Sequence, residues 1–247
     1  MHLVYEYDGS LEGFLCCVYR SFTKREMPGY IRCIQQGQLL LEEESVLIET
    51  DITKAVNVFV SFDKISPDAR DFVQNVFLTC LDGKELLLLQ WIYKGYREKV
   101  RIIDLLTDKV VFPLQKAVLA LNREAEHYRG FIRFSIFRNA LISVITPKNN
   151  VLPLLGGHFS DRYPDELFLI YDKTNHIVLV HEPGQRYYLT HADNYKLPEM
   201  DADQKNYEKL WRSFCEHITI RERKNLKCQM NHLPLRFRAD MTEFSPS

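Results

Sequence analysis

Four β-rich runs decide the fold: FIRFSIF (131–137), LISVIT (141–146), LFLIY (167–171) and HIVLVH (176–181). Turn-forming residues 138–140 separate the first two runs and residues 173–175 separate the last two, so each pair predicts a hairpin. Residues 151–163, between the hairpins, predict a short helix. Two hairpins flanking a helix indicate an antiparallel sheet of about four strands with helices on one face.

Outside these runs the apolar residues recur at helical spacing. This spacing predicts helices within residues 11–22, 72–80, 88–96 and 111–125, and an amphipathic helix over residues 207–218 near the C-terminus. The sequence therefore indicates an α+β protein with a mostly helical N-terminal half. We expect three parts: a mixed, mostly helical part (1–129), a sheet part (130–200), and a C-terminal helix with a basic segment (201–247), which together can form one compact domain.

Composition places the chain among ordinary globular proteins, with 46% hydrophobic and 26% charged residues. Six cysteines form no CxxC pair, which is typical of a reduced, cytoplasmic protein. The opening residues 1–10 lack the basic and apolar regions of a signal peptide. The most apolar run, residues 86–93, is too short to cross a bilayer, so no membrane association is expected.

The most distinctive charged feature is a basic segment near the C-terminus. Its cations are Arg221, Arg223, Lys224, Lys227, Arg236 and Arg238, against Glu222 alone. The whole chain has a formal net charge of −1, so any attraction to nucleic acid must be local. Such a cluster can neutralise phosphates and give salt-dependent, sequence-independent binding. The alternative is a solvated face, or arginines paired with acidic groups of the protein.

Two further groups of side chains are candidates for catalysis. His158, Asp161 and Arg162 lie in the predicted helix after a glycine pair, where His158 and Arg162 share one face. Glu126 and Arg133 lie at the junction between helix and strand. A histidine beside carboxylates and arginines can act as an acid or base or meet a phosphate. Surface ion pairs and backbone contacts are the commoner explanation of such residues.

Familiar cofactor motifs are absent from the sequence. It contains no P-loop, GxGxxG, HExxH or GxSxG motif, and no radical-SAM cysteine triplet or metal-ligand spacing. We therefore expect neither a resident cofactor nor a metal site.

Several stretches in order along the chain carry a family resemblance. They are residues 7–13 (YDGSLEG), 124–134, 151–153, 158–163 (HFSDRY), 170–172, 220–225 and 233–237. Together they resemble an uncharacterised bacterial family, a domain of unknown function described as a probable DNA metabolism protein. The resemblance implies a gene neighbour that is a radical-SAM DNA modification or repair protein, and in some bacteria a fusion to a uracil-DNA-glycosylase-like domain. It implies no catalytic residues.

Three functions follow as hypotheses. The first is a DNA-associated accessory protein in DNA repair or modification that acts with a radical-SAM partner. The second is an enzyme acting directly on nucleic acid, with His158, Arg162 and Glu126 in its cleft. The third is a protein-interaction module without nucleic-acid binding. The second requires its side chains to converge in one pocket.

Overall fold

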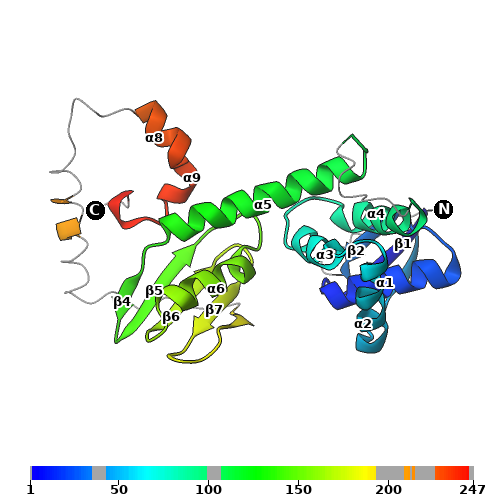
Figure 1. The fold of residues 1–247 in the computed structure, drawn as a ribbon, viewed down its shortest axis with the longest axis horizontal. Coiled ribbons are helices and arrows are strands. Elements are labelled where there is room, and N and C mark those ends of the chain that lie inside the picture. Colours follow the sequence, from blue (N-terminus) through cyan, green and yellow to red (C-terminus); the bar gives the residue numbers. More distant parts are fainter. Residues whose placement is uncertain are drawn as a thin grey trace. The chain divides into compact units, whose positions relative to one another are not determined.

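The chain forms two compact units, residues 1–121 and residues 122–247 (Figure 1). The structure is a computed structural model, and it describes residues 2–34, 43–98, 107–192, 209–211, 213, 214 and 226–244. Each unit has its own sheet. The boundary between them falls inside a helix, α5 (Val111–Phe131).

The N-terminal unit is built on a parallel sheet of three strands. These are β1 (His2–Tyr7), β2 (Tyr30–Cys33) and β3 (Glu43–Leu47), and β1 lies between the other two. The helix α1 (Leu11–Lys24) follows β1 after a turn in which Gly9 adopts a φ of 86°. The Ser10 hydroxyl begins α1 by accepting a hydrogen bond of 2.9 Å from the Gly13 N–H.

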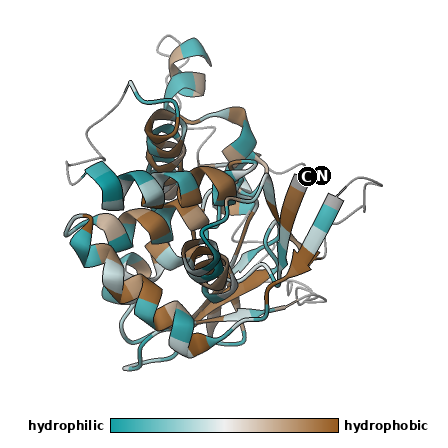
Figure 2. Cartoon of the chain, turned by 90° about the vertical axis from the view of Figure 1, so that its right-hand side faces the viewer, coloured by the Kyte–Doolittle hydropathy of each residue, from teal (hydrophilic) through white to brown (hydrophobic). Residues whose placement is uncertain are grey.

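The remaining helices of this unit share one hydrophobic core. They are α2 (Ile52–Ser61), the 3-10 helix η2 (Phe62–Lys64), α3 (Ala69–Phe77) and α4 (Lys84–Glu98). Their buried aromatic residues, Phe62, Phe72 and Trp91, join Phe14 of α1 in this core. In Figure 2 these helices alternate between apolar and polar residues, as amphipathic helices around a core do.

The C-terminal unit is built on a mixed sheet of five strands in chain order. The strands are β4 (Ser135–Phe137), β5 (Ala140–Ile145), β6 (Leu167–Asp172), β7 (Ile177–His181) and β8 (Tyr188–His191). The helix α6 (Leu152–Arg162) connects β5 to β6. Both expected hairpins are present, β4–β5 and β6–β7.

The expectation of a four-stranded antiparallel sheet is wrong. The two hairpins meet through β5 and β6, which pair in parallel from Ala140 with Leu167 to Ile145 with Asp172. The reason is the connection: α6 carries the chain back to the end of the sheet at which β5 began, so β6 runs in the same direction as β5. A fifth strand, β8, extends the sheet beyond β7.

Short helices close the described part of the C-terminal unit. They are α8 (Leu226–His232), α9 (Leu235–Arg238) and the 3-10 helix η5 (Thr242–Phe244). Phe237 of α9 is 1% exposed, and its ring contacts those of Tyr128 and Phe131 of α5. Most of the helix expected over residues 207–218 lies outside the described residues, and those described there are helical. Within the described residues, no helix combines the length and apolarity needed to cross a membrane.

Candidate functional site

The candidate site lies where the parallel strands β5 and β6 end. β5 ends at Ile145 and β6 ends at Asp172, and the N–H of Lys173 donates to the carbonyl of Ile145 at 3.0 Å. The loops that follow the two strands therefore lie side by side. In open sheets with parallel strands, ligands bind at this carboxyl edge because the connecting loops and helix N-termini face it.

A buried carboxylate from α5, that of Glu124, organises the loop after β5. Glu124 is 1% exposed. One of its oxygens, Oε1, accepts from the backbone N–H of Lys148 at 3.0 Å. The other, Oε2, accepts from the backbone N–H of Asn149 at 2.9 Å and from its side-chain amide at 2.6 Å. A carboxylate held by three donors fixes the conformation of this loop.

The same carboxylate binds a cation of the C-terminal segment. Arg236 of α9 places Nη1 at 2.9 Å from Glu124 Oε1, while 42% of the Arg236 side chain stays exposed. Its guanidinium carbon lies 4.5 Å from the centroid of the Phe237 ring. Glu124 thus ties α9 to the edge of the sheet, and a guanidinium with five N–H donors keeps part of its donor surface facing solvent.

Two more acids occupy this region. The Thr146 hydroxyl donates to Asp240 Oδ1 at 3.2 Å, and burial raises the pKa of Asp240 although Lys173 opposes the shift. Asp172 is fully buried, and burial raises its pKa even though the N–H groups of Thr174 and Asn175 donate to it. Both groups are acids whose charged form the surroundings disfavour.

Tyr128 adds a phenol to this polar region, near Asp240 and Glu124. Burial raises the pKa of Tyr128, and the carboxylates of Asp240 and Glu124 raise it further, so the phenol stays protonated at neutral pH. The residues that the structure describes contain no group of three acids, histidines or cysteines arranged to hold a metal ion. The region therefore offers hydrogen bonds and charge rather than metal coordination.

Two exposed lysines lie on the loops of this edge. Lys148 follows β5, Lys173 follows β6, and both side chains are exposed. Among the described residues neither lysine has an ion-pair partner within salt-bridge distance. Two ammonium groups on adjacent loops, with the half-exposed Arg236 bound to Glu124, form a surface that suits an anion. We call Lys148, Lys173 and Arg236 the strand-edge cations.

Comparison with known protein families bears on the same part of the chain. A sequence model of the family described as a domain of unknown function, DUF4130, matches residues 82–243. The chain belongs to the DUF4130 family. The match includes the strand-edge cations and all five strands of the mixed sheet, and it leaves out the parallel sheet of the N-terminal unit. No curated protein and no solved structure matches the chain.

The predicted basic segment is only partly described in this DUF4130 protein. Arg221, Arg223 and Lys224 lie outside the described residues. Lys227 is exposed on α8. Arg236 is the partner of Glu124. Arg238 lies over the Phe244 ring at 4.8 Å, and its Nε and Nη2 atoms are buried without a hydrogen-bond partner.

The residues predicted for catalysis have separate contacts. On α5, Glu126 pairs with Arg129. Arg133 pairs with Glu243 at 2.9 Å and donates to the carbonyl of Gly130. These contacts hold both side chains in ion pairs, Glu126 within α5 and Arg133 with the C-terminal Glu243.

The other three predicted residues lie on α6. His158 packs edge-on against the Phe159 ring at 4.9 Å, and its Nε2 atom is buried without a partner. Asp161 is exposed, and the Arg162 guanidinium lies over the Tyr163 ring at 5.7 Å. Their assignment to a catalytic cleft stays a prediction.

The strand-edge site contains residues that the sequence patterns did not single out. They are Lys148, Asn149, Lys173 and Asp240. A usable signal was present: a strand, a helix and a strand in succession predict a crossover, and a crossover predicts that residues after both strands share one edge.

Proposed function

We propose that this DUF4130 protein is a DNA-associated accessory protein in DNA repair or modification, acting with a radical-SAM partner enzyme. The observation that carries the proposal is the group of strand-edge cations. Lys148 and Lys173 are exposed and have no ion-pair partner within salt-bridge distance among the described residues, and Arg236 is bound by Glu124 at the same edge. The resemblance of the sequence to DNA metabolism proteins supplies the biological setting.

Charge makes this surface suitable for the phosphate backbone. The chain as a whole has a formal net charge of −1, so it attracts nucleic acid only where cations gather. Lysine and arginine contacts to phosphate release counterions and supply affinity without reading sequence. Lys227, Arg221, Arg223 and Lys224 of the basic segment add further cations along the chain.

The contacts of Glu124 and Asp172 support an accessory role rather than catalysis. Glu124 uses its carboxylate to hold a loop and a helix, and Asp172 uses its carboxylate to hold the turn after β6. These two carboxylates have structural tasks that account for their positions. The chemistry is accordingly assigned to the partner enzyme.

DNA binding is tested directly by fluorescence anisotropy. The full chain is titrated into labelled single-stranded and double-stranded DNA at low and at physiological salt. We expect binding at low salt that weakens strongly between about 50 and 200 mM salt. If the chain binds no DNA at low salt, either alone or with the partner, the proposed DNA binding is refuted.

The partner is tested by copurification with a radical-SAM protein of the kind that the family resemblance implies, with and without nuclease. An association through DNA is lost after nuclease treatment. An association that survives nuclease, in a chain that binds no DNA, supports the protein-interaction module instead.

A further inference from the structure

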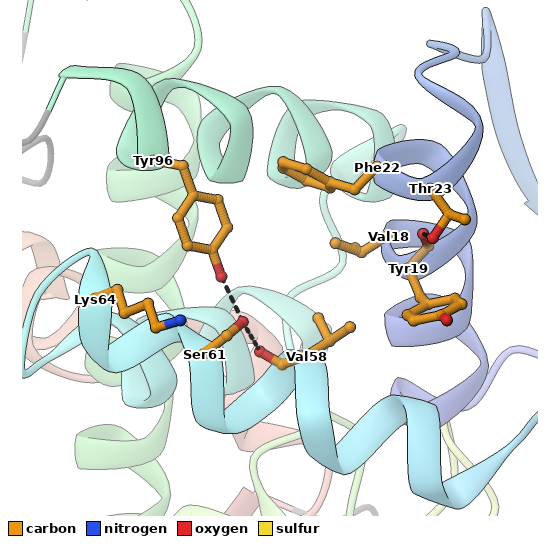
Figure 3. Close-up of a pocket in the computed structure, with 8 residues that line it drawn as sticks. All are labelled: Val18, Tyr19, Phe22, Thr23, Val58, Ser61, Lys64 and Tyr96. Carbon is orange, nitrogen blue, oxygen red and sulfur yellow. Dashed lines mark hydrogen bonds between the residues drawn. The ribbon is translucent and has the colours of Figure 1, made fainter.

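A pocket in the N-terminal unit has the features of a small-molecule site. It lies between α1, α2, η2 and the end of α4, and Figure 3 shows its lining residues. Its volume is about 460 Å³, which falls within the range of ligand-binding pockets. Of its lining residues, Tyr96 lies inside the DUF4130 match, and those of α1, α2 and η2 precede it.

Most of the pocket surface is apolar. Val18 and Phe22 come from α1 and Val58 comes from α2. Two aromatic contacts hold the Phe22 ring in place: it stacks on the Tyr93 ring at 4.0 Å and meets the Tyr96 ring edge-on at 5.5 Å. These walls are preformed and favour an aromatic or branched aliphatic body.

One wall carries two hydroxyl groups, those of Ser61 and Tyr96, whose donor and acceptor roles can be assigned. The Ser61 hydroxyl donates to the carbonyl of Val58 at 2.5 Å, so it has no second proton to give. In its 2.5 Å contact with the Tyr96 hydroxyl, Ser61 is therefore the acceptor and Tyr96 is the donor. Burial raises the pKa of Tyr96, which keeps this phenol protonated. The Tyr96 oxygen is left with acceptor capacity alone, so it suits a ligand that donates.

The same wall carries a cation. Lys64 ends η2, is exposed, and points toward Ser61 in Figure 3, across the pocket from Tyr19 and Thr23. Its neighbour Asp63 is already paired with Arg70. Among the described residues Lys64 has no ion-pair partner, so its ammonium is available to an anion.

We propose that this pocket binds a small amphipathic carboxylic acid that carries a hydroxyl donor next to its carboxylate. The apolar body lies against Val18, Phe22 and Val58, the carboxylate meets the Lys64 ammonium, and the adjacent hydroxyl donates to the Tyr96 oxygen. The assignment is independent of DNA binding, because the strand-edge cations belong to the other unit.

Matched probes test the assignment. The probe with all three features is 3-phenyllactate; 3-phenylpropionate lacks the hydroxyl, 3-phenylpropane-1,2-diol lacks the charge, and 1-amino-3-phenylpropan-2-ol reverses it. Binding to the full chain is followed by amide chemical shifts of α1 and α2. We expect 3-phenyllactate to bind most tightly and the amine least. Equal binding of the acid and the amine, or no shifts at millimolar probe, overturns the proposal.

Variants separate the two polar contacts. We expect Lys64→Gln to weaken 3-phenyllactate about fivefold, the upper end for an exposed ion pair, and to leave the diol unchanged. Lys64→Arg keeps the binding, and Lys24→Gln, at another exposed lysine, serves as the control. Tyr96→Phe should remove the advantage of 3-phenyllactate over 3-phenylpropionate. An effect of Lys64→Gln on all probes alike, or on none, contradicts the assignment; thermal melting establishes that each variant is folded.

Discussion

Replacing Glu124 with glutamine should destabilise the C-terminal unit strongly. The carboxylate is 1% exposed, accepts three hydrogen bonds and pairs with Arg236 at 2.9 Å. A glutamine keeps one acceptor oxygen, but its N–H₂ group would face the donors that the second carboxylate oxygen accepts from in the wild type. Breaking a buried ion pair costs about 3–5 kcal/mol, and we take about 3 kcal/mol because Arg236 is half exposed. Arg236→Gln should cost less, about 1 kcal/mol, because the Glu124 carboxylate keeps its three other hydrogen bonds.

The matched control for this substitution is Glu126→Gln on the same helix. Glu126 pairs with Arg129, but 66% of its side chain is exposed. The control should change the free energy of unfolding by less than about 0.5 kcal/mol. Urea unfolding followed by circular dichroism gives these values, and a double-mutant cycle with Arg236→Gln should give a coupling of about 1 kcal/mol.

Hydrogen exchange locates the effect in the structure. The amides of Lys148 and Asn149 donate to Glu124 in the wild type, so Glu124→Gln should speed their exchange before that of the β5–β6 ladder. If Glu124→Gln and Glu126→Gln unfold at the same urea concentration, with unchanged exchange at these amides, the organising role of Glu124 is refuted.

Further predictions concern the glycine pair of α6 and a buried acid. Gly156→Ala should destabilise by about 1–3 kcal/mol, because its Cβ would lie 2.3 Å from the Tyr187 ring, as thermal melting would show. Gly157→Ala should be neutral or stabilising by up to about 1 kcal/mol, because its added Cβ would have no neighbouring atom within 4 Å. Equal effects at both positions would contradict the packing of Gly156 against Tyr187. The pKa of Asp172 is raised in the folded state. The free energy of unfolding of the wild type, relative to that of Asp172→Asn, should therefore fall as pH rises from about 4 through the raised pKa. If the wild-type free energy of unfolding stays constant or grows relative to that of the variant, the result is inconsistent with the burial of this acid.

Local sequence signals predicted individual elements better than their assembly. The β4–β5 hairpin turns at Arg138 and Asn139, which adopt φ values of 47° and 75°. Asn139 marks this turn in the sequence, because asparagine tolerates positive φ in tight turns. The helix predicted within residues 11–22 is likewise present as α1, which Ser10 caps. The direction of β6 relative to β5 depends on the path of α6, and neither hairpin by itself encodes that path. The residues of both hairpins are compatible with either arrangement.

The candidate site shows the same division between local and long-range information. The basic segment is visible as a run of charge, but charge alone does not separate Arg236, which pairs with a buried acid, from Lys227, which is exposed. The loops after β5 and β6 meet only because the strands are parallel. Lys148 and Lys173 therefore carry no signal in the sequence until the crossover through α6 is recognised.

The salt dependence of DNA binding shows whether the strand-edge cations contact phosphate. Log Kobs is measured against log salt for the wild type and for the variant Lys148→Gln/Lys173→Gln/Lys227→Gln. The control carries Lys24→Gln, Lys109→Gln and Lys116→Gln, three exposed lysines of the other unit. On duplex DNA we predict a slope that is shallower by about 0.9 for each phosphate that the variant no longer neutralises, and an unchanged slope for the control. Equal slopes for all three proteins, or no measurable binding by the wild type at low salt, would contradict the role of the strand-edge cations.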